Sequence, residues 1–263
     1  MAQDRSILSK PGWALTKAYL HGRSCLNMRD DDVVLALFPK TGSTWVRYFI
    51  YNLLCLEERG DAEVSIDEMN GVMPEFAHRT LFKEWPFKNC PRIVKTHRSR
   101  NRVLSGRPTV LVVRDPRDVA VSFYHYASAS KNIGFDGTLK EFIRHPQCGL
   151  NSFFKQYNSW RDQAGLVLRY EDLKAGPIGE FTRLVEFLKI PAARENIQRA
   201  VELSSMDKMR KAQERSNEFK DKFSEGFVFA RSGASEQWKG VFDEEDIHYW
   251  ETLKSANRFT LYE

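Results

Sequence analysis

The chain has 263 residues, of which 42% are hydrophobic and 29% are charged, and its formal net charge at pH 7 is +5. This composition is that of a globular protein with enough apolar residues for a sizeable core. The mild positive charge favours an anionic ligand. Without a concentrated basic patch it does not indicate a nucleic-acid-binding protein, so we expect no nucleic acid as partner.

Short apolar runs alternate with longer amphipathic segments along the chain. The predicted strands are residues 33–38, 92–95, 109–113 and 166–169, and the predicted helices are residues 43–56, 116–129 and 177–188. Strands that alternate with helices indicate an α/β fold with a mostly parallel central sheet flanked by helices. No linker divides the chain, so we expect a single domain over residues 1–263.

Two segments are irregular in pattern, residues 60–89 and 215–233. The first is rich in turn formers and aromatic residues, and the second alternates charged residues with phenylalanines. Long connections in compact domains are often binding loops or lids, and a plain surface excursion is the alternative.

Cysteine usage and the N-terminus bear on the compartment. The four cysteines are widely separated and form no C-x-x-C pair: Cys25, Cys55, Cys90 and Cys148. They predict reduced thiols in a cytoplasmic protein, with no metal site, either as buried filler or as a reactive group. The N-terminus carries Asp4, Arg5 and Lys10, which argues against a secretory signal, and no apolar run is long enough to span a membrane.

A phosphate-binding loop is predicted where the first strand leads into the first helix. Lys40 supplies a charge, Gly42 allows close approach, and Ser43 and Thr44 begin a helix whose N–H groups and dipole attract anions. A Walker loop needs its lysine after the second glycine, whereas Lys40 precedes Gly42. A P-loop ATPase or kinase is therefore disfavoured, and an ordinary strand-to-helix turn is the other interpretation.

Other polar residues follow the second and third strands. Lys95 and His97 come at the end of one, and Arg114 at the end of the other, with Ser122 eight residues later. Open α/β sheets bind ligands at this edge, and an arginine fork suits a second phosphate. The alternatives are a structural histidine and a solvated charge cluster around Asp115.

Together these motifs resemble the cytosolic sulfotransferase family, which transfers a sulfuryl group from 3′-phosphoadenosine 5′-phosphosulfate (PAPS) to an acceptor. The resemblance covers roughly residues 33–242. The segments that carry it, in order, are Pro39 to Trp45 (the 5′-phosphosulfate loop), Lys95-Thr96-His97, Arg114 with Ser122 (the 3′-phosphate site), Tyr170 to Leu173, and Phe229 to Gly233 followed by Trp238-Lys239.

The resemblance implies a set of roles for these residues. His97 is the expected general base, Lys40 stabilises the leaving oxygen, Lys95 steadies the sulfuryl oxygens, and Ser122 restrains Lys40. No metal is needed. The implied nucleotide-binding residues are Lys40, Thr41, Gly42, Ser43, Thr44, Trp45, Arg114, Ser122, Tyr170, Ser204, Met206, Phe229, Arg231, Ser232 and Gly233.

The chain departs from the family pattern in two places. The closing loop usually reads Arg-Lys-Gly, but here Ser232 stands in the middle position, so one cation is missing. The family's dimer motif after Lys239 is replaced by a stretch with Asp243, Glu244 and His248, and acidic residues in a small self-paired patch repel each other. We therefore expect a monomer.

The acceptor pocket is expected to use aromatic residues on both sides of His97 in the sequence. They are Phe76, Phe82, Trp85, Phe87, Tyr124, Phe135 and Phe153. Aromatic residues around one base suit a small apolar or phenolic alcohol, although each could equally be a core residue. Carbohydrate or protein-tyrosine acceptors, an inactive module that binds PAPS or its product PAP (3′-phosphoadenosine 5′-phosphate), and a nucleotide kinase are the alternative functions.

Overall fold

A single parallel sheet forms the centre of the molecule. The computed structural model describes residues 11–60, 64–223 and 233–262. The strands β1 (Val33–Leu37), β2 (Ile93–Thr96), β3 (Thr109–Val113) and β4 (Leu166–Arg169) lie in the order β2-β1-β3-β4. Val34 of β1 faces Val94 on one side and Thr109 on the other. The predicted α/β class with a parallel sheet is confirmed.

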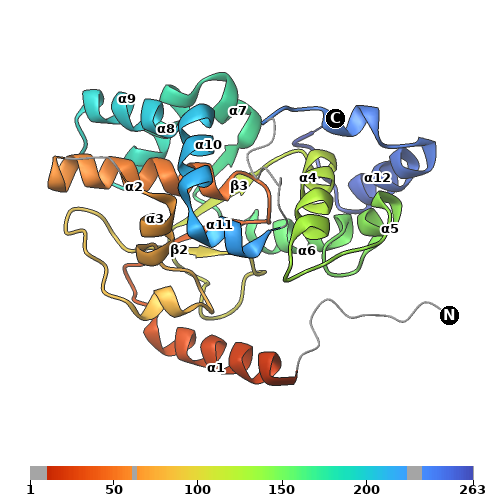
Figure 1. Ribbon diagram of the computed structural model, residues 1–263, viewed down its shortest axis with the longest axis horizontal. Coiled ribbons are helices and arrows are strands. Elements are labelled where there is room, and N and C mark those ends of the chain that lie inside the picture. The colour runs from red at the N-terminus through yellow and green to blue at the C-terminus, as the bar shows by residue number, and fades with distance from the viewer. Residues whose placement is uncertain (1–10, 61–63, 224–232, 263) are drawn as a thin grey trace.

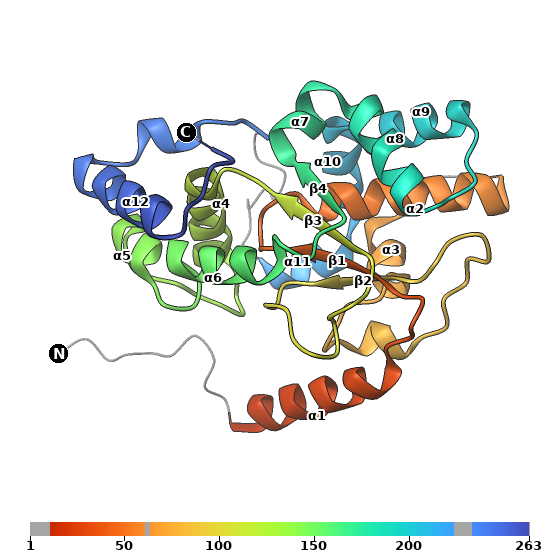
Figure 2. The ribbon, with the colours of Figure 1, turned by 180° about the vertical axis from the view of Figure 1, so that it is seen from behind.

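Helices cover both faces of this sheet (Figures 1 and 2). In chain order they are α1 (Pro11–Asn27), α2 (Ser43–Arg59), α3 (Ile66–Val72), α4 (Pro116–Ala129), α5 (Leu139–Arg144), α6 (Leu150–Trp160), α7 (Tyr170–Ala175), α8 (Pro177–Phe187), α9 (Arg194–Leu203), α10 (Met206–Arg215), α11 (Asn217–Lys222) and α12 (Glu244–Ala256). Two short 3-10 helices, η1 (Arg79–Phe82) and η2 (Gln237–Gly240), accompany them.

The alternation of side chains along the strands divides the core into two clusters. On β1, Val33, Leu35 and Leu37 pack in the cluster that α2, α3, α8 and α9 cover. Val34 and Ala36 pack in the other cluster, which α4, α5, α6 and α12 cover. Figure 1 shows these two groups of helices on opposite sides of the sheet, with α1 apart from both beside η1. Because both faces are covered, the central strand β1 is continuously apolar, and β3 is apolar after Thr109.

Element boundaries agree with the sequence except at some ends. The strand predicted at 33–38 ends at Leu37, the strand predicted at 92–95 begins one residue later, and the helix predicted at 177–188 ends at Phe187. Arg92 does not belong to the strand, and its guanidinium binds Asp32 at 2.7 Å. The helix predicted at 43–56 continues to Arg59, where Gly60 (φ 71°) ends it.

No helix in the described ranges is both long and apolar enough to cross a bilayer. The four cysteines are free thiols, and all but Cys25 are buried. Burial raises the pKa of Cys90 to about 12 and that of Cys148 to about 11, so these two thiols are unreactive filler at neutral pH.

Candidate active site

The carboxyl ends of all four strands deliver residues to one edge of the sheet. Lys40 follows β1, His97 follows β2, Arg114 follows β3 and Tyr170 follows β4. The chain leaves β1 toward β2 and leaves β3 toward β4, so the direction of the connections reverses between β1 and β3. Ligands bind at such a switch point in open α/β sheets. The guanidinium of Arg114 bridges it by donating to the Lys40 carbonyl at 3.4 Å.

The loop between β1 and α2 has an unusual backbone. Lys40 adopts φ 73° and Gly42 adopts φ 103°. Thr41 is buried, and its hydroxyl donates to the Phe38 carbonyl at 2.8 Å, which fixes the loop from within. Gly42 is the N-cap of α2 and offers no side-chain acceptor. The first N–H groups of α2, beginning at Ser43, are therefore left for an anion.

The side chain of Lys40 lies against α4, at Tyr126. Its ammonium nitrogen is 4.6 Å from the centre of the Tyr126 ring. Ser122 is half-buried one helical turn before Tyr126, so both lie on the face of α4 that meets the loop. Burial, with the charge of Arg114 as a second cause, holds the pKa of Lys40 well below its ordinary 10.5. An anion at this loop would restore the charged form.

His97 is held in one tautomer. Its Nδ1 lies 3.0 Å from the Leu37 carbonyl oxygen, which can only accept, so Nδ1 carries the proton and Nε2 keeps a lone pair. Burial, and then the charge of Lys95, lower the pKa of His97 to about 4, against an opposing effect of Glu75. The ordinary value of 6.5 therefore does not apply here, and the imidazole is neutral over a wider pH range.

Lys95 is paired within the protein. Its ammonium group lies 2.8 Å from a Glu75 carboxylate oxygen, and the backbones of the two residues also bridge. Burial is the largest single effect and would raise the pKa of Glu75. The charge and hydrogen bond of Lys95, together with the effects of His97 and Arg47, outweigh it and lower that pKa to about 2. The pair stays ionised, so Lys95 meets any ligand together with a carboxylate.

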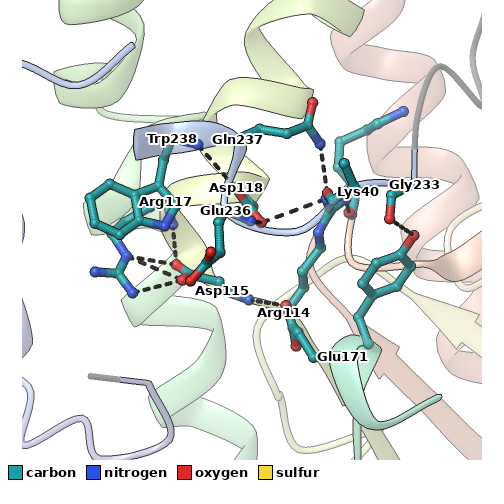
Figure 3. A network of polar contacts seen from close by, with 12 residues as sticks. Lys40, Arg114, Asp115, Arg117, Asp118, Glu171, Gly233, Glu236, Gln237 and Trp238 are labelled. Carbon is teal, nitrogen blue, oxygen red and sulfur yellow. Dashed lines mark hydrogen bonds and ion pairs between the residues drawn. The ribbon is translucent and has the colours of Figure 1, made fainter. Parts of the chain in front are cut away.

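Arg114 (Figure 3) forms the other end of the site together with Tyr170. The guanidinium of Arg114 stacks on the Tyr170 ring at 4.4 Å and donates to the Ala234 carbonyl at 2.9 Å. Its Nε is buried and has no hydrogen-bond partner in the part of the chain that the structure describes. The Tyr170 hydroxyl donates to the Gly233 carbonyl at 3.3 Å, and Trp45 meets the Tyr170 ring edge-on at 5.7 Å.

The segment after Gly233 is anchored to α4 by Asp118 (Figure 3). The Asp118 carboxylate is fully buried and accepts from the backbone N–H groups of Glu236, at 2.8 Å, and Trp238, at 3.2 Å. Arg117 adds a stacking contact 3.9 Å from the Trp238 ring centre. These contacts bring residues 234–238 beside Arg114, although more than a hundred residues separate them in the sequence.

Some of the residues predicted to bind the nucleotide contact other parts of the protein instead, and others lie outside the described residues. Ser204 is fully buried, and its hydroxyl donates to the Ala200 carbonyl one turn earlier. Met206 packs against Gly233, where an added Cβ would lie 2.6 Å from its terminal methyl. Phe229, Arg231 and Ser232 fall outside the residues that the structure describes.

A cavity of about 460 Å³ adjoins the loop and His97. Its wall combines the charged and polar ends of some residues with the apolar surfaces of others: Pro39, Lys40, Ser43, Thr44, Arg47, Asn70, Met73, Glu75, His78, Thr80, Lys95, His97, Phe123, Tyr126, Ile133, Glu218, Phe219, Lys222 and Phe223. Both irregular segments thus contribute to it, the first through residues 70–80 and the second through residues 218–223.

None of the seven aromatic residues predicted for the acceptor pocket lines this cavity. Phe76, Phe87 and Phe153 are buried in the two core clusters. The other four pack partly buried against the clusters: Phe82, Trp85, Tyr124 and Phe135. The cavity instead uses Phe123 and Tyr126 of α4 and Phe219 and Phe223 at α11.

Sequence reasoning overlooked Arg47, Asn70 and Glu218 in this wall. Arg47 carried a usable signal, because it is a charged residue inside an apolar helix, four residues after Ser43 and thus on the same face. Asn70 and Glu218 carried none, since their contact at 2.8 Å joins residues 148 positions apart. The described part of the chain holds no group of three or more His, Cys, Asp or Glu side chains placed to bind a metal.

Comparison with known proteins identifies the class. The profile of the sulfotransferase domain family matches residues 30–253. The chain belongs to this sulfotransferase family, which confirms the predicted enzyme class, a PAPS-dependent sulfotransferase.

Individual relatives are similar at modest identity. Human sulfotransferase 1E1 is 26% identical, with 87% of this chain and 85% of the relative aligned. Mouse sulfotransferase 1 family member D1 is 27% identical, with 88% and 84% aligned. Among solved structures, retinol dehydratase in complex with retinol and PAP has a TM-score of 0.73 at 20% identity, covering 96% of this chain and 88% of the other. Mouse sulfotransferase SULT7A1 complexed with PAP has a TM-score of 0.72 at 18% identity, covering 97% and 95%.

Proposed function

We propose that the protein transfers the sulfuryl group of PAPS to a hydroxyl of a small acceptor, with His97 as the general base. The observation that carries the proposal is that His97, whose Nε2 keeps a lone pair, lines the same cavity as the loop that follows β1. The base and the loop come from different strands, and only the sheet brings them together. The family membership, and the PAP bound in the two similar structures, support PAPS as the donor.

The donor site fits a nucleotide with phosphates at both ends. The Lys40 loop and the start of α2 would hold the 5′ end. Arg114, a buried cation whose Nε has no partner, would hold the 3′-phosphate, with Ser122 on the adjoining helix. Tyr170 and Trp45 would flank the base. Leaving a buried guanidinium nitrogen unpaired is costly, so an anion that reaches it gains affinity.

When bound, PAPS supplies the sulfuryl group that is transferred. His97 accepts the proton of the acceptor hydroxyl at Nε2, and the Leu37 carbonyl holds the ring in orientation. Lys40, recharged by the anionic donor, stabilises the negative charge on the leaving oxygen. Lys95 stays paired with Glu75 and acts on the sulfuryl oxygens as part of that pair.

The acceptor would occupy the cavity of about 460 Å³, a volume within the range of small-molecule sites. Phe123, Tyr126, Phe219 and Phe223 would contact an apolar or phenolic body. We also propose a cytoplasmic setting, which the free and mostly buried thiols support.

The test is turnover with PAPS and a panel of simple phenols, comparing the wild type with His97→Ala. We expect sulfated product from the wild type and a loss of roughly two to four orders of magnitude in kcat for His97→Ala. PAP affinity, measured by calorimetry, should stay near the wild-type value because His97 is assigned to the acceptor side. Near-normal turnover by His97→Ala would refute the assignment of the base. PAP binding without turnover of any acceptor would favour the inactive module.

A further inference from the structure

One buried cation on the acceptor side has no role in the proposed chemistry. Arg47 lies on α2 and is 6% exposed, and it lines the cavity with His97. Among the described residues, its Nε has no hydrogen-bond partner, and no carboxylate forms an ion pair with its guanidinium. A buried charge without a partner is unfavourable, so it indicates a ligand group that completes it.

Two carboxylates, those of Glu75 and Glu218, raise the pKa of Arg47 by their charge, but each already binds another residue. Glu75 binds Lys95 at 2.8 Å. Glu218 accepts from Asn70 at 2.8 Å and pairs with Lys222. Both carboxylates oppose the effect of burial, which lowers the pKa of Arg47, but neither contacts its guanidinium. The charge of Arg47 is therefore attracted by Glu75 and Glu218, but neither carboxylate is hydrogen-bonded to its guanidinium.

The cavity also has apolar walls that suit the aromatic part of a ligand whose anionic group binds Arg47. Met73, Phe123, Ile133 and Phe219 provide apolar wall, and His97 provides the base. A ligand with three parts would match these groups. Its hydroxyl would lie at His97, its aromatic body would lie along the apolar wall, and its anionic group would lie at Arg47. The guanidinium of Arg47 can pair with a planar carboxylate through two parallel N–H groups.

We propose that Arg47 is a specificity residue that binds an anionic group, such as a carboxylate, carried by the acceptor. The preferred acceptors are then phenol-like compounds that bear an acid group, rather than neutral phenols. This inference rests on the proposed function, because it names the substrate class for the same site.

Three acceptors of matched shape test the proposal: para-hydroxyphenylpropionate, para-propylphenol and para-aminoethylphenol, with PAPS saturating. For the wild type we expect kcat/KM to be highest for the propionate, by roughly tenfold to a hundredfold over propylphenol. Arg47→Met should remove this preference while turnover of propylphenol stays within about threefold, and Arg47→Lys should retain part of it. Arg59→Met, which changes an exposed arginine on the same helix, is the matched control and should keep the preference.

Two further measurements separate the possible failures. Thermal unfolding should show Arg47→Met to be as stable as the wild type or more so, because an unpaired buried charge is removed. Calorimetric binding of para-hydroxyphenylpropionate to wild type and Arg47→Met, without PAPS, tests the subsite even if the proposed reaction fails. An unchanged preference in Arg47→Met, an equal loss for all three acceptors, or a wild-type preference for the amine would overturn the proposal. Absence of turnover together with Arg47-dependent binding would instead refute the proposed function alone.

Discussion

At the scale of single residues, burial determines the protonation of His97, the proposed base. The lowered pKa of His97, about 4, means that the free enzyme keeps Nε2 unprotonated well below neutral pH. We expect kcat/KM to be level from neutral pH down to about pH 5, and to fall below that with an apparent pKa of about 4. A pH profile with an acid limb near 6.5 would contradict this expectation.

The same shift affects stability, with a sign that follows from proton uptake. Between pH 6.5 and about 4 the unfolded chain protonates His97 and the folded chain does not. The stability that comes from a neutral His97 is therefore complete above pH 6.5 and is lost as the pH falls toward 4. Denaturant unfolding of the wild type and His97→Ala should show a smaller dependence on pH in the variant over this interval.

Arg114 provides the test of how the nucleotide lies. Because it is assigned to the 3′-phosphate, Arg114→Ala should weaken PAP far more than AMP, which lacks that group. A charge-assisted contact is worth about 2–3 kcal/mol, so the preference for PAP over AMP should fall by roughly thirtyfold or more. Lys40→Ala should leave the preference largely unchanged. Calorimetry with both nucleotides measures this, and equal losses in Arg114→Ala would mean that the phosphate sites are interchanged.

At the scale of elements, the start of α2 depends on a glycine that touches another strand's end. Gly42 has φ 103°, and an added Cβ would lie 3.0 Å from the Tyr170 ring. Gly42→Ala should cost about 1–3 kcal/mol of stability and should also weaken PAP, because Tyr170 supports Arg114 and Gly233. Denaturant unfolding and PAP titration measure the two effects.

Gly60 at the other end of α2 is the matched control. It also has a positive φ, 71°, but none of the described atoms lies within 4 Å of the position that an added Cβ would take. Gly60→Ala should lower stability and leave PAP affinity unchanged. If both variants weakened PAP equally, the contact between Gly42 and Tyr170 would have no part in nucleotide binding.

At the scale of the whole molecule, acidic residues of the stretch that replaces the family's dimer motif form ion pairs with basic residues of the same chain. Lys140 of α5 binds Asp243 at 2.8 Å and Glu245 at 2.7 Å, and Arg144 binds Asp246 at 2.6 Å. These ion pairs connect α12 to α5. The monomer stays a prediction. Sedimentation at micromolar concentration should give a single monomeric species. A tight dimer that substitutions within residues 239–248 dissociate would refute it.

Much of this architecture is determined by local sequence. The apolar runs at 109–113 and 166–169 become strands with the predicted bounds, and polar residues directly after strands reach the ligand edge. Both follow from short-range causes, because β-branched runs favour strands and parallel strands end at the same edge. Lys40, His97 and Arg114 could therefore be chosen as candidates from the sequence alone.

Only the tertiary structure decided which side chains face the cavity. Phe153 and Phe123 are both aromatic residues in helices and both pack in the same core cluster, yet only Phe123 also lines the cavity. Composition does not distinguish them, because burial against a core and exposure to a cavity require the same apolar surface. The meeting of Arg47, Glu75, His97 and Glu218 depends on contacts between segments that are far apart in the chain. Such contacts are set by how the helices pack on the sheet, and no local pattern encodes them.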